Sequence, residues 1–64
     1  MQIKLKKKID NIISTKVSDK DKINMLLELN ANQCRTGTMT KKTSRYIYRH
    51  IKSLDYNLGS LLLS

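Results

Sequence analysis

The sequence predicts an all-α protein, a small three-helix bundle in one domain that spans residues 1–64. Three segments repeat aliphatic residues at the spacing that places them on one face of a helix. The chain contains no tryptophan and no phenylalanine, so its core must come largely from isoleucine and leucine, which suits a small helical bundle. It also contains no proline, and we find no low-complexity linker and no internal repeat. A chain of 64 residues buries a modest fraction of its surface, so each apolar side chain matters for stability.

The first two helices are predicted over about residues 3–14 and 18–31. The first carries its apolar face at Leu5, Ile9, Ile12 and Ile13. The second begins at Ser18, with Asp21 three residues later as in a capping box and with Asp19 near the positive helix terminus. Its apolar residues predict the most buried element, sandwiched between the other two helices: Ile23, Leu26, Leu27 and Ala31, widened by Met25 and Leu29.

The third helix is predicted over about residues 41–58, after a loop at 32–40 that has turn-forming residues and no sustained period. Thr40 or Thr43 can cap its start. Ile47, Ile51, Leu54 and Leu58 form its apolar face, and Gly59 is a natural stop. Residues 59–64 then form an apolar tail, which is expected to fold back on the bundle or to pack on another chain.

The net charge is +8, from 13 basic and 5 acidic residues, which favours binding to a polyanion. An AT-rich coding sequence would also supply many lysines, without selection for binding. The distribution of charge argues against that explanation, because six basic residues and no acidic one lie between Arg35 and Lys52.

The basic residues of the third helix share one face. With Arg45 at zero on a helical wheel, its basic neighbours fall within roughly 60° and the aliphatic residues on the opposite side. The candidate nucleic-acid-binding residues on and beside this face are Lys41, Lys42, Arg45, Tyr46, Tyr48, Arg49 and Lys52. Tyr46 and Tyr48 flank the face and Tyr56 lies near its centre, where aromatic rings can stack on bases. The alternative is that Tyr46 and Tyr48 are boundary residues with a buried ring and a hydrated hydroxyl.

Residues 43–54, TSRYIYRHIKSL, combine a hydroxyl start, alternating basic and aromatic residues, and aliphatic anchors. This segment resembles the recognition helix of many small helix-turn-helix regulators, over about a fifth of the chain. The resemblance implies a loosely helix-turn-helix-like arrangement that presents a basic helix to DNA. A loop containing threonine and glycine stands where those regulators have a short helix and a tight turn.

No enzymatic chemistry is predicted. The sequence has no paired carboxylates, no glycine-rich phosphate loop and no metal-ligand spacing, so we expect no catalytic residue, no metal and no cofactor. His50 falls beside the apolar face, as a partly buried histidine would, and Cys34 next to Arg35 is expected to be a small loop residue with no reactive role. A single cysteine and the absence of a long apolar run lead us to expect a cytoplasmic protein that is not bound to membrane.

The leading hypothesis is a DNA-binding regulatory or accessory protein of a phage or mobile element, with RNA as a close variant. The alternative is a small inhibitor or adaptor that docks the same basic face on a host nucleic-acid-handling enzyme or another acidic protein surface. Lys4, Lys6, Lys7, Lys8 and Arg35 are expected to act as an accessory basic cluster. The leucines near the C-terminus are expected to enter the core or a homodimer interface: Leu58, Leu61, Leu62 and Leu63.

Overall fold

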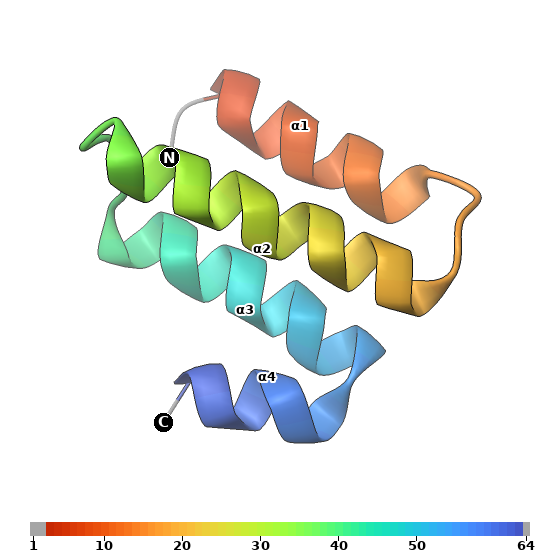
Figure 1. The fold of residues 1–64 in the computed structure, drawn as a ribbon. Coiled ribbons are helices and arrows are strands. Elements are labelled where there is room, and N and C mark those ends of the chain that lie inside the picture. Colours follow the sequence, from red (N-terminus) through yellow and green to blue (C-terminus); the bar gives the residue numbers. More distant parts are fainter. Residues whose placement is uncertain (1–2, 64) are drawn as a thin grey trace.

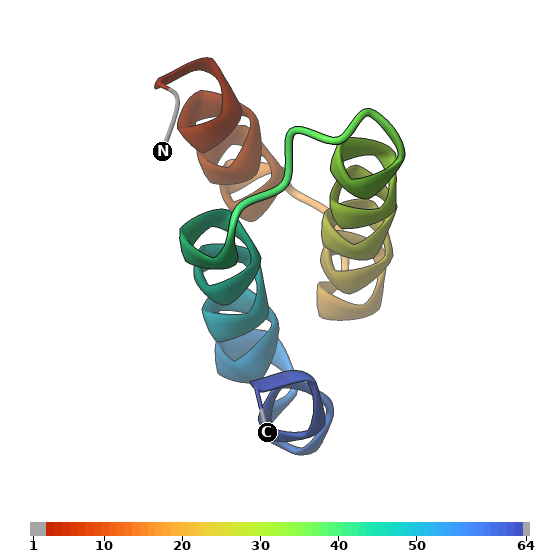
Figure 2. The same cartoon turned by 90° about the vertical axis from the view of Figure 1, so that its left-hand side faces the viewer.

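The computed structural model describes residues 3–63, which form four helices and no strand. The helices are α1 (Ile3–Ser14), α2 (Asp19–Arg35), α3 (Lys41–Leu54) and α4 (Tyr56–Leu63). The all-helical prediction is therefore confirmed, whereas the count of three helices is wrong. Consecutive helices run antiparallel, and α3 lies between α2 and α4 in Figure 1. Seen end-on in Figure 2, α1 and α3 lie side by side, with α2 on one side of them and α4 beyond α3.

The core gathers at the meeting of α1, α2 and α3. Its buried side chains are Leu5 and Ile9 of α1, Leu26 of α2, and Ile47 and Ile51 of α3. All five lie on the apolar faces that the sequence predicts. Two details differ from the prediction: α2 is not the most buried helix, since only Leu26 in it is buried, and Met25 is 38% exposed. The central element is α3, which packs against neighbours on both sides (Figure 1).

The N-terminal caps agree with the sequence. The Ser18 hydroxyl accepts a hydrogen bond from the backbone N–H of Asp21 at 3.2 Å, which starts α2. Thr40 caps α3 in the same way, accepting from the N–H of Thr43 at 3.2 Å. Of the two predicted caps of α3, Thr40 performs the role and Thr43 lies buried in the first turn.

The loop predicted over 32–40 begins four residues too early, because α2 continues to Arg35. A Schellman motif ends the helix: the N–H of Thr38 bonds the carbonyl of Gln33 at 3.1 Å, and that of Gly37 bonds Cys34 at 3.2 Å. Gly37 adopts a φ of 72°, the left-handed conformation that this motif needs and that glycine supplies without strain. Cys34 is consequently an exposed helical residue and not a loop residue.

The third helix ends at Leu54 and not at residue 58. Asp55 adopts an extended conformation, which closes α3 and starts α4. Its carboxylate oxygen Oδ1 accepts from the N–H of Leu58 at 3.2 Å, and its carbonyl accepts from Gly59 at 3.0 Å. The predicted apolar tail thus belongs to a helix through Leu63, with residue 64 outside the described residues.

Gly59 is not the helix stop that the sequence predicts but a contact point inside α4. It is buried against α3, where a Cβ atom added at position 59 would lie 2.1 Å from Cα of Lys52. Only glycine allows the two backbones to approach this closely. The close contact fixes α4 along one side of α3, and this placement decides which part of α3 remains open.

Candidate functional site

The side chains of α3 contact different parts of the molecule, depending on the face of the helix on which they lie. Thr43, Ile47 and Ile51 are buried in the core. Tyr46 lies on the α1 side, because its hydroxyl donates a hydrogen bond to Asp10 Oδ1 at 2.8 Å. Tyr48 lies on the α2 side, where Asn30 Nδ2 donates to its hydroxyl at 3.2 Å. The strip between the two tyrosines carries the exposed cations.

Four of the five basic residues predicted on this face are exposed: Lys41, Lys42, Arg45 and Arg49. The fifth, Lys52, is half-buried beneath Gly59 of α4, and its ammonium lies 4.9 Å from the centroid of the Tyr56 ring. That distance is in the range of a cation–π interaction. The sequence predicts Tyr56 on the third helix, but it is the first residue of α4, where it still adjoins Lys52.

Three of the exposed cations meet one aromatic ring. Lys42, Arg45, Tyr46 and Arg49 line an open hollow of about 400 Å³, which we call the basic hollow. Within residues 3–63 no salt bridge engages any of these three cations. Because their charge is not neutralised locally, the basic hollow is a site at which an anion would be attracted.

Tyr46 forms a fixed wall of the basic hollow. Besides its hydrogen bond to Asp10, its ring packs edge-on against His50, with 4.7 Å between the ring centroids and 74° between the planes. The hydrogen bond to Asp10, burial, and the charge of Asp10 raise the pKa of the Tyr46 hydroxyl above its ordinary 10.0. The hydroxyl is thus committed to Asp10 as a donor, and the ring is what Tyr46 offers to a ligand.

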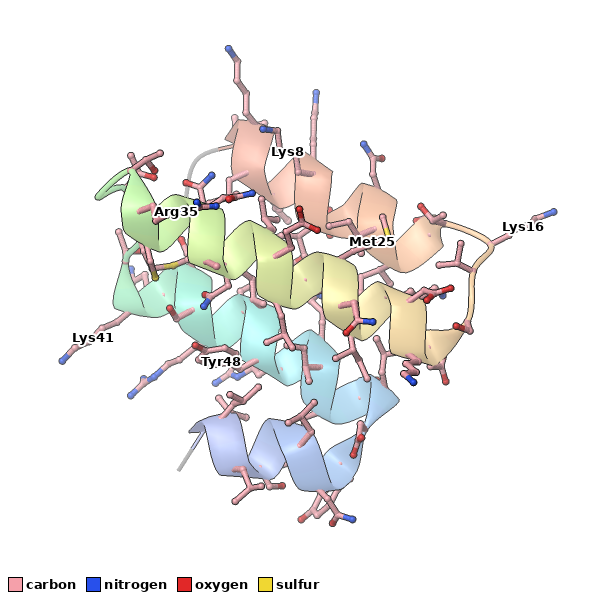
Figure 3. The ribbon with its side chains drawn as sticks, viewed as in Figure 1. Lys8, Lys16, Met25, Arg35, Lys41 and Tyr48 are labelled. Carbon is pink, nitrogen blue, oxygen red and sulfur yellow. The ribbon has the colours of Figure 1, made fainter. Side chains whose placement is uncertain are left out.

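A second hollow lies beyond Arg45, on the α4 side of α3. This apolar groove has a volume of about 330 Å³ and is lined by Met39, Tyr48, Leu62 and Leu63, with four polar residues at its rim: Thr40, Lys41, Ser44 and Arg45. Figure 3 shows Tyr48 between α3 and α4, and Lys41 extending outward from the start of α3. Arg45 lines both hollows and therefore lies between them.

The accessory cations are dispersed. Lys4, Lys6, Lys7 and Lys8 are all exposed on α1, and Arg35 lies at the end of α2, where it donates a hydrogen bond to Asn32 Oδ1. Figure 3 shows Lys8 and Arg35 on different helices and both away from Lys41.

Sequence reasoning missed one residue that shapes the site. Asp10 fixes Tyr46 from another helix, 36 positions away in the chain, and no local pattern signals such a pair. Met39 lies in the loop before α3, as predicted, and it also packs against the core and lines the apolar groove. His50, predicted to be partly buried, is half-buried and contacts Tyr46.

Comparisons with protein-family models, with curated proteins and with solved structures found no match for this chain. Within residues 3–63, no three metal-ligating side chains gather where they could hold a metal ion. In the same range, no helix is both long enough and apolar enough to cross a membrane.

Proposed function

We propose that this protein binds nucleic acid through the exposed strip of α3, with DNA as the first candidate. One observation carries the proposal: Lys42, Arg45 and Arg49 converge beside Tyr46 and none of them has a carboxylate partner among residues 3–63. Lysine and arginine side chains neutralise phosphates, and phosphate contacts supply most of the affinity of nucleic-acid-binding proteins. A regulatory or accessory role in a phage or mobile element, in the cytoplasm, remains part of the same proposal.

The mode of binding follows from the neighbours of α3. A helix-turn-helix-like use of α3 would place its exposed strip in a groove of the duplex, with the arginines reaching base edges. α4 covers the Lys52 side of α3, and α1 stands along the Tyr46 side. The strip available for contact is therefore narrower than the whole helix, and its cations are Lys41, Lys42, Arg45 and Arg49.

The first prediction is a steep dependence on salt. Four phosphate contacts at a log–log slope of about 0.9 each would weaken binding to a DNA duplex on the order of a hundredfold between about 50 and 200 mM salt. Fluorescence anisotropy of a labelled duplex, titrated at a series of salt concentrations, measures the slope. Affinity that does not change with salt, or no binding of either a duplex or a single strand at low salt, would rule out the nucleic-acid proposal.

A second candidate function rests on the apolar groove. A small inhibitor or adaptor could dock an acidic protein surface there, because Lys41 and Arg45 stand beside Met39, Leu62 and Leu63. Leu63 lines the apolar groove but not the basic hollow, so Leu63→Ser separates the two functions. A single protein partner that survives nuclease treatment in a pull-down, and that Leu63→Ser loses, would favour the adaptor.

We also propose that the protein forms a homodimer through α4. Leu58, Leu62 and Leu63 are half-buried on this helix, whereas Leu61 is 74% exposed. A two-fold interface would cover Leu61 in both copies. Sedimentation equilibrium is expected to show a dimer for the wild type and a monomer for Leu61→Ser, with Lys16→Ser as a matched surface control. A wild type that stays monomeric at all concentrations would exclude this interface.

A further inference from the structure

We propose that the basic hollow holds an unstacked nucleobase of a single-stranded nucleic acid, with Tyr46 as the stacking surface and the surrounding cations on the flanking phosphates. This inference rests on the proposed function, because it names the form of nucleic acid that the same site takes. It assigns Tyr46 the specific role of stacking and Asp10 the role of positioning Tyr46.

The first support is the fixed position of the Tyr46 ring. Its hydroxyl donates a hydrogen bond to Asp10 of α1 at 2.8 Å, and its ring packs edge-on against His50. A ring that is ordered before the ligand arrives does not lose side-chain freedom on binding, which increases the net gain from stacking. The two contacts hold Tyr46 from α1 and from α3, and its surface borders the open hollow.

The second support is the arrangement of charge along the helix. Lys42 lies one turn before Tyr46 and Arg49 lies nearly one turn after it, with Arg45 beside it. A base stacked on the Tyr46 ring would therefore have a cation on each side. One cation could bind the phosphate that precedes the base, and the other could bind the phosphate that follows it. A groove of positive charge with an aromatic platform is the combination that single-stranded nucleic acids bind, with little sequence preference.

The third support is that α3 is flanked by other helices. In a duplex the bases are stacked and paired, so a side chain reaches them only from within a groove. Figure 2 shows α1 beside α3 and α4 next to it, so α3 does not project alone from the molecule. A flexible single strand can follow the exposed strip and turn one base toward Tyr46. It has no groove into which α1 and α4 would have to fit beside α3.

The first test uses the unmodified full chain and three probes: an oligothymidine of about 12 nucleotides, an abasic strand of equal length and charge, and a duplex of equal length. Stacking of one base predicts that the oligothymidine binds about fivefold to a hundredfold more tightly than the abasic strand. It also predicts tighter binding of the oligothymidine than of the duplex. Equal affinity for the oligothymidine and the abasic strand, or tighter binding of the duplex, would overturn the inference and leave the proposed function standing. Failure of all three probes to bind would overturn both.

The second test uses variants of Tyr46. Tyr46→Leu is expected to lose the preference for the oligothymidine over the abasic strand, whereas Tyr46→Phe keeps the ring and most of the preference. Tyr48→Phe is the matched control, since Tyr48 lines the apolar groove and not the basic hollow. Asp10→Asn keeps a group that can accept from the Tyr46 hydroxyl and is expected to retain the preference. Loss of the preference in Tyr48→Phe, or its persistence in Tyr46→Leu, would contradict the assignment of Tyr46.

Discussion

Replacing Gly59 with alanine is expected to destabilise the protein by about 1–3 kcal/mol, the usual cost of inserting a methyl group into a packed contact. The added Cβ would lie 2.1 Å from Cα and 2.4 Å from the backbone N of Lys52, so α3 and α4 would have to separate. Backbone atoms cannot turn aside as a flexible side chain can. Helix propensity alone predicts the opposite sign, because alanine is favoured over glycine by about 1 kcal/mol inside a helix.

Thermal unfolding followed by circular dichroism measures this effect, and each kcal/mol is expected to lower the Tm by about 4–8 °C in a domain of this size. Asn57→Ala is the matched control, because Asn57 is exposed on the same helix and its replacement changes helix propensity without a clash. We expect Asn57→Ala to be neutral or slightly stabilising. A Tm that rises in Gly59→Ala would show that the close contact between α3 and α4 does not exist in solution.

Local patterns predict the core of this fold because helical periodicity alone determines which residues can share a face. Leu5, Ile9, Leu26, Ile47 and Ile51 all lie on predicted apolar faces and are buried. The caps at Ser18 and Thr40 follow from equally local chemistry, a hydroxyl that accepts from a backbone N–H three residues later.

The helix ends were harder to predict because one residue type has several uses. Gly37 lies in the loop, as predicted, but a glycine just past a helical segment is also the signal of a Schellman motif, and here that motif ends α2 at Arg35, later than the sequence predicts. Asp55 stands within an aliphatic repeat that suggests one continuous helix, yet it caps a new one. Gly59 resembles a stop in the sequence, and only the approach of α3 reveals it as a contact.

The candidate site was predictable in its charges but not in its boundaries. The helical wheel places Lys42, Arg45 and Arg49 on one face, and all three line the basic hollow. The wheel carries no information about neighbouring helices, so it could not separate Lys52, which α4 covers, from these three exposed cations. The partner of Tyr46 was equally inaccessible, because Asp10 belongs to another helix.

The double substitution Arg45→Ala, Arg49→Ala is expected to cost far more nucleic-acid affinity than Lys6→Ala, Lys7→Ala. Each phosphate contact contributes a factor of about eight at about 0.1 M salt, so the loss of two lowers the affinity roughly sixtyfold. It should also reduce the log–log salt slope by about 1.8. Lys6 and Lys7 are exposed on α1, outside the basic hollow, and we expect their removal to weaken binding only through the general field of the protein.

The two double variants are matched because each removes two positive charges and lowers the net charge from +8 to +6 (8 − 2). Any difference between them therefore reports the position of the charges and not their number. All four residues are exposed, so thermal unfolding is expected to be nearly unchanged in both variants. Anisotropy titrations at several salt concentrations give the affinity and the slope together. A larger loss in Lys6→Ala, Lys7→Ala would move the binding site to α1, whereas equal small losses would mean that the protein attracts polyanions only through its net charge.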